Sequence, residues 1–69
     1  MSTINIQVNG KKHICEEAIK LPELLTELEL NPRLIAVEYN GEILHRQNWE
    51  KTTVKEGDRL EVVTIVGGG

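Results

Sequence analysis

The chain opens with alternating polar and apolar residues. Positions 3–8 read Thr-Ile-Asn-Ile-Gln-Val, which is the two-residue period of a half-buried strand. Asn9-Gly10 follows, and because both residues tolerate positive φ, this pair predicts a tight hairpin. A two-residue loop sets Ile4 opposite Cys15, so we expect Cys15 to face the core and Ile14 to face the other side of the sheet.

The spacing of apolar residues changes from Leu21 onward. Leucines at positions 21, 24, 25 and 28 form one stripe on a helix. Pro22 fits the first helical turn, and Asn31-Pro32 marks a stop. The pattern predicts a helix of about ten residues, a length typical of globular proteins. Its glutamates at positions 23, 27 and 29 are expected to face solvent.

The second half of the chain predicts three further strands. Residues 34–39 and 42–44 flank a second hairpin pair, Asn40-Gly41, which sets Val37 against Leu44 in the core. Residues 45–53 lack alternation and are expected to form a loop or short 3₁₀ segment anchored by the indole of Trp49. After a turn at 55–58, the β-branched run 60–66 predicts a final strand, with its residues at 60 and 62 facing inward.

This order of elements predicts the fold class. Two strands, one helix and three more strands indicate an α+β fold in which a mixed sheet of four to five strands packs on one helix. The order is typical of a ubiquitin-like β-grasp, where the first and last strands can lie parallel in the centre. Sixty-nine residues allow one domain. We assign it to residues 1–66 and expect residues 67–69 to form a flexible C-terminal glycine tail.

Composition narrows the class of partner and the compartment. Eight basic and eleven acidic residues give a net charge of -3, so no basic field is available for nucleic acid. No apolar run approaches the roughly 18 residues that span a bilayer, and no secretory leader is evident. The single cysteine forms no internal disulfide, in keeping with a reducing compartment. We therefore expect a cytoplasmic monomer without membrane or nucleic-acid partners.

The sequence Val66-Gly67-Gly68-Gly69 follows the last predicted strand directly. Simple fraying is one interpretation, because three glycines add nothing to a small core. The functional interpretation is that a segment without side chains threads through a channel too narrow for any Cβ atom. A terminal carboxylate is ionised at neutral pH and is a poor electrophile. Another protein would have to join it to AMP before a sulfur nucleophile could displace the nucleotide and leave a thiocarboxylate, because this chain has no phosphate-binding glycine loop.

Six segments of the chain carry a resemblance to a known family: Val8-Asn9-Gly10, Leu24-Leu25, Asn40-Gly41-Glu42-Ile43, Arg46-Gln47-Asn48-Trp49, Glu56-Gly57-Asp58 and Val66-Gly67-Gly68-Gly69. The whole chain resembles the ThiS family, the sulfur carriers of thiamin thiazole biosynthesis within the ubiquitin-like β-grasp superfamily. The molybdopterin-type sulfur carriers are also similar, but the Arg-x-x-Trp segment and the short length favour ThiS. Ala18-Ile19-Lys20 departs from the glycine turn that often precedes the helix in relatives.

The resemblance implies a protein cosubstrate, not an enzyme. Gly69 matches the glycine that the family adenylates and converts to a thiocarboxylate, and Gly68 matches its diglycine partner, with Gly67 preceding them in the threading tail. The implied partners are a ubiquitin-activating-like adenylyltransferase (ThiF type), a thiazole synthase (ThiG type) and a sulfur donor such as a cysteine desulfurase. No cofactor is bound by the chain, and ATP is consumed by the activating partner. The alternatives are a molybdopterin-type carrier or a β-grasp interaction module whose glycines are passive.

Other candidate sites are weaker. The outward positions of the predicted sheet form a modest apolar patch suited to partner docking. Its members are Ile14, Ile43, Val63, Ile65 and Val66. Cys15 beside His13 lacks a third orienting residue for nucleophilic catalysis, and a lone buried cysteine is usually a small hydrophobe. His13, Cys15 and His45 lack a closed metal-ligand spacing. We expect Arg46 and Trp49 to have a structural role more than a binding one.

Overall fold

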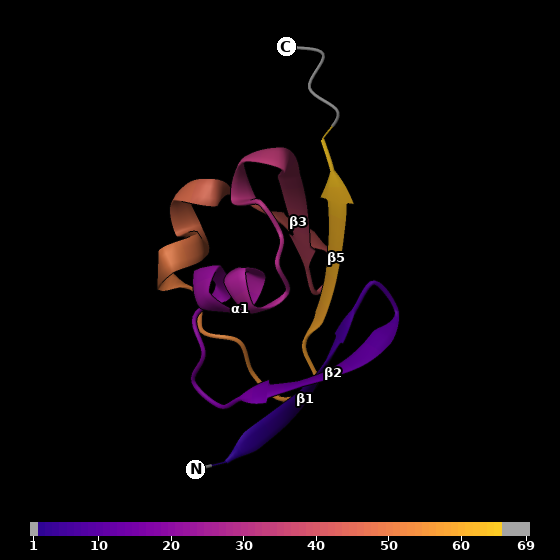
Figure 1. The fold of residues 1–69 in the computed structure, drawn as a ribbon, viewed down its shortest axis with the longest axis vertical. Helices are drawn as coiled ribbons and strands as arrows, with labels where there is room; N and C mark the ends of the chain where they lie inside the picture. The colour runs from indigo at the N-terminus through magenta and orange to yellow at the C-terminus, as the bar shows by residue number, and fades with distance from the viewer. Residues whose placement is uncertain (1, 66–69) are drawn as a thin grey trace.

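The computed structural model describes residues 2–65, and within this range a five-stranded sheet packs on one α-helix (Figure 1). The predicted α+β class is therefore confirmed. Two short 3₁₀ helices, η1 and η2, complete the structure. The elements in chain order are β1 (Thr3–Val8), β2 (Lys11–Glu16), α1 (Leu21–Glu27), η1 (Pro32–Leu34), β3 (Ile35–Tyr39), β4 (Glu42–Leu44), η2 (Arg46–Lys51) and β5 (Arg59–Thr64).

The sheet is mixed, with the last strand near its centre. The strand order is β2-β1-β5-β3-β4, in which β1 and β5 are parallel and the other neighbours are antiparallel. This is the β-grasp arrangement that the order of elements predicted. In Figure 1, β5 begins beside the β1–β2 hairpin and runs along the long axis of the molecule, away from that hairpin. The end of β5 thus points away from the β1–β2 hairpin.

Both hairpins form as the Asn-Gly pairs predict. Asn9 and Asn40 each have a φ of 53°, and the glycines that follow are also positive, at 81° and 90°. The resulting registers place Ile4 opposite Cys15 and Val37 opposite Leu44, as expected from two-residue loops. The inward and outward faces of all four hairpin strands therefore follow from the sequence.

The helix is shorter than predicted. It ends at Glu27 after seven residues, so the expected stop at Asn31-Pro32 was wrong. Glu29 adopts the left-handed conformation, with a φ of 60°. The amide of Glu29 donates to the carbonyl of Thr26 and that of Leu30 to the carbonyl of Leu25, both at 3.0 Å. These two bonds form a Schellman motif, which usually has glycine at the left-handed position. With glutamate at that position, no local signal marked this helix end.

The start of the helix agrees with the prediction. Helix α1 begins at Leu21, and the amide of Lys20 donates to Oε1 of Glu23 at 3.0 Å, which satisfies a backbone donor at the helix entrance. Ala18 has a φ of 65°, a conformation that L-residues adopt at a steric cost and glycine adopts freely. Ala18, in the segment where the family resemblance implies a glycine turn, therefore has a glycine-like backbone conformation.

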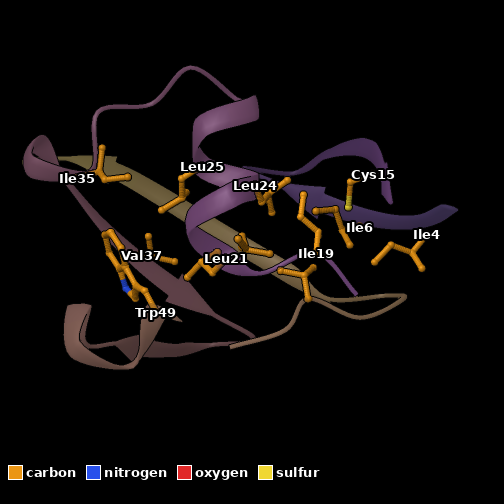
Figure 2. Packing of buried hydrophobic residues seen from close by; sticks show 12 residues of the cluster. Ile4, Ile6, Cys15, Ile19, Leu21, Leu24, Leu25, Ile35, Val37 and Trp49 are labelled. Carbon is orange, nitrogen blue, oxygen red and sulfur yellow. The ribbon is translucent and has the colours of Figure 1, made fainter. Parts of the chain in front are cut away.

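The core lies between the sheet and α1 (Figure 2). Trp49 is buried at its edge, next to Val37 in Figure 2, and its Nε1 donates to the carbonyl of Leu44 at 3.0 Å. Val62, predicted to face inward, is half-buried, and so is Leu44. The buried residues are Ile4, Ile6, Cys15, Ile19, Leu21, Leu24, Leu25, Ile35, Val37, Trp49, Val54 and Leu60.

The predicted bounds of two strands shift slightly. Leu34 closes η1, so β3 begins one residue later than expected, at Ile35. Strand β5 spans Arg59–Thr64 instead of 60–66. The proposed boundary between the domain and the glycine tail, at residues 66 and 67, lies outside the described residues.

Candidate functional site

The predicted reactive tail starts where the described chain ends. Val66, Gly67, Gly68 and Gly69 lie outside the described residues. Ile65 is the last residue described, and its amide donates to the carbonyl of Leu34 at 2.6 Å. The sheet therefore still holds the backbone one residue beyond β5, and the position from which the tail departs is fixed.

The start of β5 is held by a buried carboxylate. Asp58 accepts hydrogen bonds from Oη of Tyr39, from the amide of Lys55 at 2.8 Å and from Nδ2 of Asn40 at 3.1 Å. The amide of Arg59 in turn donates to Oδ1 of Asn40 at 2.8 Å. Burial, the hydrogen bond to Asp58 and its negative charge raise the pKa of Tyr39 above its ordinary value. This network fixes β5 against the β3–β4 hairpin.

Exposed apolar side chains gather on the outer sheet face near the end of β5. Val63 lies opposite Ala36 in the β3–β5 register, and Ile65 follows opposite Leu34. Ile43 and Val63 line one shallow hollow, and Ile43 and Ile65 line a neighbouring one. We call Leu34, Ile43, Val63 and Ile65 the tail-base patch. Their side chains are 50%, 69%, 57% and 46% exposed, respectively.

Ile14 lies away from the tail-base patch. It is 57% exposed and faces outward as predicted, but it belongs to β2, which is one edge of the sheet, while Ile43 belongs to β4, the other edge. Three strands separate these edges, and neighbouring strands are spaced by about 4.8 Å. The structure thus brings together three predicted patch residues, Ile43, Val63 and Ile65, and sets Ile14 apart.

Arg46 and Trp49 form a local structural unit. The guanidinium carbon of Arg46 lies 4.9 Å from the centroid of the Trp49 ring, within the range of a cation–π interaction. Nη1 of Arg46 also donates to the carbonyl of Pro32. Because Pro32 opens η1, these contacts tie η2 to the segment that leads into β3. The pair borders the hollow that contains Ile43 and Ile65, and so it also supports the tail-base patch.

Cys15 is placed as a core residue. It is 5% exposed, and Figure 2 shows its sulfur directed toward the interior beside Ile6. Burial, and secondarily the charge of Glu27, raises the pKa of its thiol. A raised pKa reduces the thiolate fraction at neutral pH. His13 is half-buried on the same strand, and its Nε2 has no hydrogen-bond partner within residues 2–65.

The described residues contain neither a metal-binding cluster nor a membrane-spanning helix. Residues 2–65 contain no group of three His, Cys, Asp or Glu side chains able to hold a metal ion together. No helix within that range is long and apolar enough to cross a membrane. The tail base and its apolar surroundings therefore remain the candidate functional site.

A family model described as "ThiS family" matches residues 4–69. The chain belongs to the ThiS family. The match includes both Asn-Gly hairpins, β5 and all three terminal glycines. It confirms the family resemblance that the sequence motifs indicated.

A solved structure extends this assignment to the fold. The crystal structure of the thiamine biosynthesis protein ThiS from Geobacter metallireducens is 39% identical to this chain, with a TM-score of 0.84. The alignment covers 96% of this chain and 100% of that one. At 39% identity the two proteins belong to one family. This chain therefore has the strand order and strand pairing of a ThiS β-grasp.

Three further proteins are similar to this chain in sequence. The uncharacterized protein ycf40 of Pyropia yezoensis is 43% identical, over 99% of this chain and 96% of its own length. The sulfur carrier protein ThiS of Bacillus subtilis is 29% identical, over 93% and 98% of the two chains. A thiazole synthase of Paramagnetospirillum magneticum is 33% identical over 96% of this chain, which corresponds to 20% of that protein. A segment similar to this chain is thus part of a longer thiazole synthase.

Leu34 is the patch residue that the sequence analysis missed. It was assigned to the strand that starts at residue 34, but its side was not considered. In the structure Leu34 ends η1, its side chain is exposed, and its carbonyl accepts the hydrogen bond from the amide of Ile65. The two-residue period of a strand does not apply to a 3₁₀ residue, so the alternation held no signal for Leu34.

Proposed function

We propose that this ThiS family member is a sulfur carrier of thiamine biosynthesis whose reactive group is the C-terminal carboxylate of Gly69. The observation that carries the proposal is the family match through Gly69, combined with the hydrogen bond that holds Ile65 at the end of the sheet. A fixed departure point followed by glycines presents a backbone without Cβ atoms to a partner's active site.

The proposed chemistry has two steps. The Gly69 carboxylate attacks the α-phosphorus of ATP and releases pyrophosphate, which gives an acyl adenylate. A sulfur donor at the oxidation level of sulfide then attacks the carbonyl carbon, AMP leaves with one carboxylate oxygen, and a thiocarboxylate remains. This chain acts as a cosubstrate in both steps. ATP is bound and consumed by a ThiF-type adenylyltransferase. A cysteine desulfurase supplies the sulfur as a persulfide, which a thiol reductant converts to sulfide while the reductant is oxidised to its disulfide.

The recipient of the sulfur in this proposal is a thiazole synthase of the ThiG type. The match to a segment of the Paramagnetospirillum magneticum thiazole synthase supports it, because a carrier-like segment and the synthase then occur within one chain. Domains joined in one chain act at a high effective concentration. Separate carrier and synthase chains would instead rely on a docking surface.

The tail-base patch is the proposed docking surface. Its four side chains surround the point where the chain leaves the sheet, so a partner that holds the tail covers them at the same time. Exposed apolar clusters of this kind mark interaction sites. Val66, which was also predicted for this surface, lies outside the described residues. Ile14 is not included in the proposed surface because it lies on the far edge strand.

Intact-mass spectrometry tests the carrier function. The chain is incubated with a ThiF-type adenylyltransferase, ATP, a cysteine desulfurase, cysteine and a thiol reductant. Exchange of oxygen for sulfur at the terminus adds about 16 Da to the mass, whereas a persulfide on a cysteine adds about 32 Da. We expect the smaller gain in the parent and in Cys15→Ala, and no gain in a variant that lacks Gly68 and Gly69.

The Cys15→Ala variant distinguishes sulfur carried at the C-terminus from sulfur carried at Cys15. Because Cys15 is the single cysteine and its thiol is buried, Cys15→Ala removes the only thiol without touching the tail. Loss of the 16 Da gain in a folded Cys15→Ala protein would show that the thiol takes part in the transfer. Absence of any gain in the parent under conditions that load the Bacillus subtilis carrier would contradict the carrier proposal and leave a β-grasp binding module.

A further inference from the structure

Two glutamates stand directly opposite each other on the outer face of the sheet. Glu38 of β3 pairs with Glu61 of β5 in the antiparallel register, and both are exposed. Cβ atoms of directly opposed residues lie roughly 4.5–5.5 Å apart, and like charges in this position are destabilising. Neither carboxylate takes part in an ion pair or a hydrogen bond within residues 2–65. The fold therefore keeps a like-charge pair that has no direct ionic partner in the described chain.

The carboxylates border an apolar hollow on the side of the tail base. This hollow has a volume of about 120 Å³ and is lined by Ala36, Val37, Glu38, Ile43, Glu61 and Val63. Four of the six lining residues are apolar, and two of them, Ile43 and Val63, belong to the tail-base patch. The two acidic groups thus stand at the end of a hollow with aliphatic walls.

Arg59 lies on the other side of the acidic pair. It faces outward two residues before Glu61 and lines a separate hollow together with Glu38 and Glu61. Its positive charge offsets part of the repulsion through solvent, but the distances exceed those of an ion pair. Arg59 does not line the apolar hollow, so the carboxylate edges that face the tail base remain available to a cation.

The shape and charge of this hollow select one kind of side chain. Arginine combines an aliphatic stem, which packs on apolar surface, with a planar guanidinium. The five donors of that group bridge carboxylate oxygens in a bidentate manner. Lysine offers a point charge without this planar geometry. An acidic side chain would add a third negative charge, and an apolar one would leave both carboxylates unpaired and desolvated.

We propose that the hollow is a socket for an arginine side chain of the adenylyltransferase that activates Gly69. This inference rests on the proposed carrier function and specifies how the partner recognises it. The position of the hollow supports the assignment, because Val63 is six residues from Gly69. An extended chain of that length reaches at most about 20 Å. The partner that holds the terminus therefore has protein surface within reach of the socket.

Neutral substitution of both glutamates tests the socket. The double variant Glu38→Gln/Glu61→Gln keeps the size of both side chains and removes both charges. The readout is ATP–pyrophosphate exchange by a purified ThiF-type adenylyltransferase, measured against carrier concentration at low and high salt. We expect KM for the carrier to rise about tenfold or more, with kcat within about twofold, and the dependence of KM on salt to weaken.

A second pair of glutamates provides the matched control. Glu16→Gln/Glu17→Gln makes the same change in net charge at exposed positions at the end of the edge strand β2, far from the socket. We expect its KM to stay within about twofold of the parent, because general electrostatic steering changes little with two remote charges. Thermal unfolding checks the fold, and the Glu38→Gln/Glu61→Gln protein should melt at the same temperature as the parent or higher.

The outcomes separate the socket from the carrier function. A parent chain that supports exchange together with an unchanged KM in Glu38→Gln/Glu61→Gln would overturn the socket alone. Equal increases in KM for the two double variants would reduce the effect to net charge and would also overturn it. A fall in kcat at constant KM would place the glutamates in the chemical step instead. Failure of the parent chain itself to support exchange would overturn the proposed function, and the socket with it.

Discussion

The side-chain amide of Asn9 pairs with the backbone of Val62 as a strand residue would. The amide of Val62 donates to Oδ1 of Asn9 at 2.7 Å, and Nδ2 of Asn9 donates to the carbonyl of Val62 at 3.2 Å. The β1–β5 register ends at Val8 and Leu60, and the amide of Asn9 then donates to the carbonyl of Leu60 at 2.8 Å. The asparagine of the first hairpin therefore extends the parallel pairing of β5 toward the tail base.

Replacement of Asn9 by glycine should weaken this attachment. Glycine keeps the positive φ of 53° accessible and removes both side-chain hydrogen bonds. We expect the free energy of unfolding in urea to fall by about 1–2 kcal/mol, since a typical hydrogen bond contributes about 1 kcal/mol net. Asn9→Asp keeps the acceptor for the amide of Val62 and should lose less. Equal stability of Asn9→Gly and the parent would show that the amide pairing contributes nothing measurable.

The turn at Asn9 could be predicted from the sequence, but the contact between Asn9 and Val62 could not. The Asn9-Gly10 pair specifies a tight turn because the backbone requirement is local. Its contact with Val62 joins residues 53 positions apart, and no local pattern encodes which strand will lie beside the turn. The strands and their faces were predictable for the same reason that the turn was, since a two-residue period is a local signal. The parallel pairing of β1 with β5 depended on the fold class.

Glu29 offers a stabilising substitution. It occupies the left-handed position of the Schellman motif that ends α1, with a φ of 60°, where a side chain costs roughly 1–2 kcal/mol. Glycine removes this strain but has greater freedom in the unfolded chain. We expect Glu29→Gly to raise the free energy of unfolding by about 0.5–1 kcal/mol, measured by urea denaturation.

A glycine inside the helix gives the control for this substitution. Glu27 is the last residue of α1, and glycine in a helix is less favourable than an ordinary residue by up to about 1 kcal/mol. Glu27→Gly should therefore lower stability while Glu29→Gly raises it. Destabilisation by both would mean that the Glu29 side chain makes a contribution larger than its backbone strain.

Tyr39 should make the free energy of unfolding depend on pH in the alkaline range. Burial, and then the hydrogen bond and charge of Asp58, raise its pKa in the folded state, whereas an unfolded tyrosine titrates at about 10. The stabilisation is present in full below about pH 10 and is lost as pH rises further, because the unfolded chain then releases a proton that the folded chain retains. Tyr39→Phe removes this dependence.

Two measurements check the Tyr39 prediction. At neutral pH, Tyr39→Phe leaves buried Asp58 with one donor fewer, so we expect a loss of about 1–3 kcal/mol in the free energy of unfolding. Between about pH 10 and 11 the difference from the parent should shrink. Because Tyr39 is the single tyrosine, phenolate absorbance reports its titration directly. Release of the phenolic proton at the unfolded pKa in the folded protein would contradict the prediction.

The candidate site was less predictable than the fold. The outward direction of Ile14, Ile43, Val63 and Ile65 followed from the alternation, but the sequence did not reveal how far apart these residues lie on the sheet. Strand order decides that distance, and it places β2 and β4 at opposite edges. The opposition of Glu38 and Glu61 was likewise invisible, because it depends on the register between β3 and β5, two strands that no tight turn connects.

Two exposed apolar residues with the same accessibility test which part of the sheet docks the partner. Val63 and Ile14 are each 57% exposed and both face outward, but only Val63 belongs to the tail-base patch. We expect Val63→Asp to weaken binding of a ThiF-type adenylyltransferase about tenfold or more, which corresponds to about 1.4 kcal/mol, and Ile14→Asp to stay within about twofold. Calorimetric titration gives both affinities, and circular dichroism confirms that each variant is folded. Equal weakening by the two substitutions would indicate a docking surface that spans the whole sheet, and a larger effect of Ile14→Asp would move it to the β1–β2 hairpin.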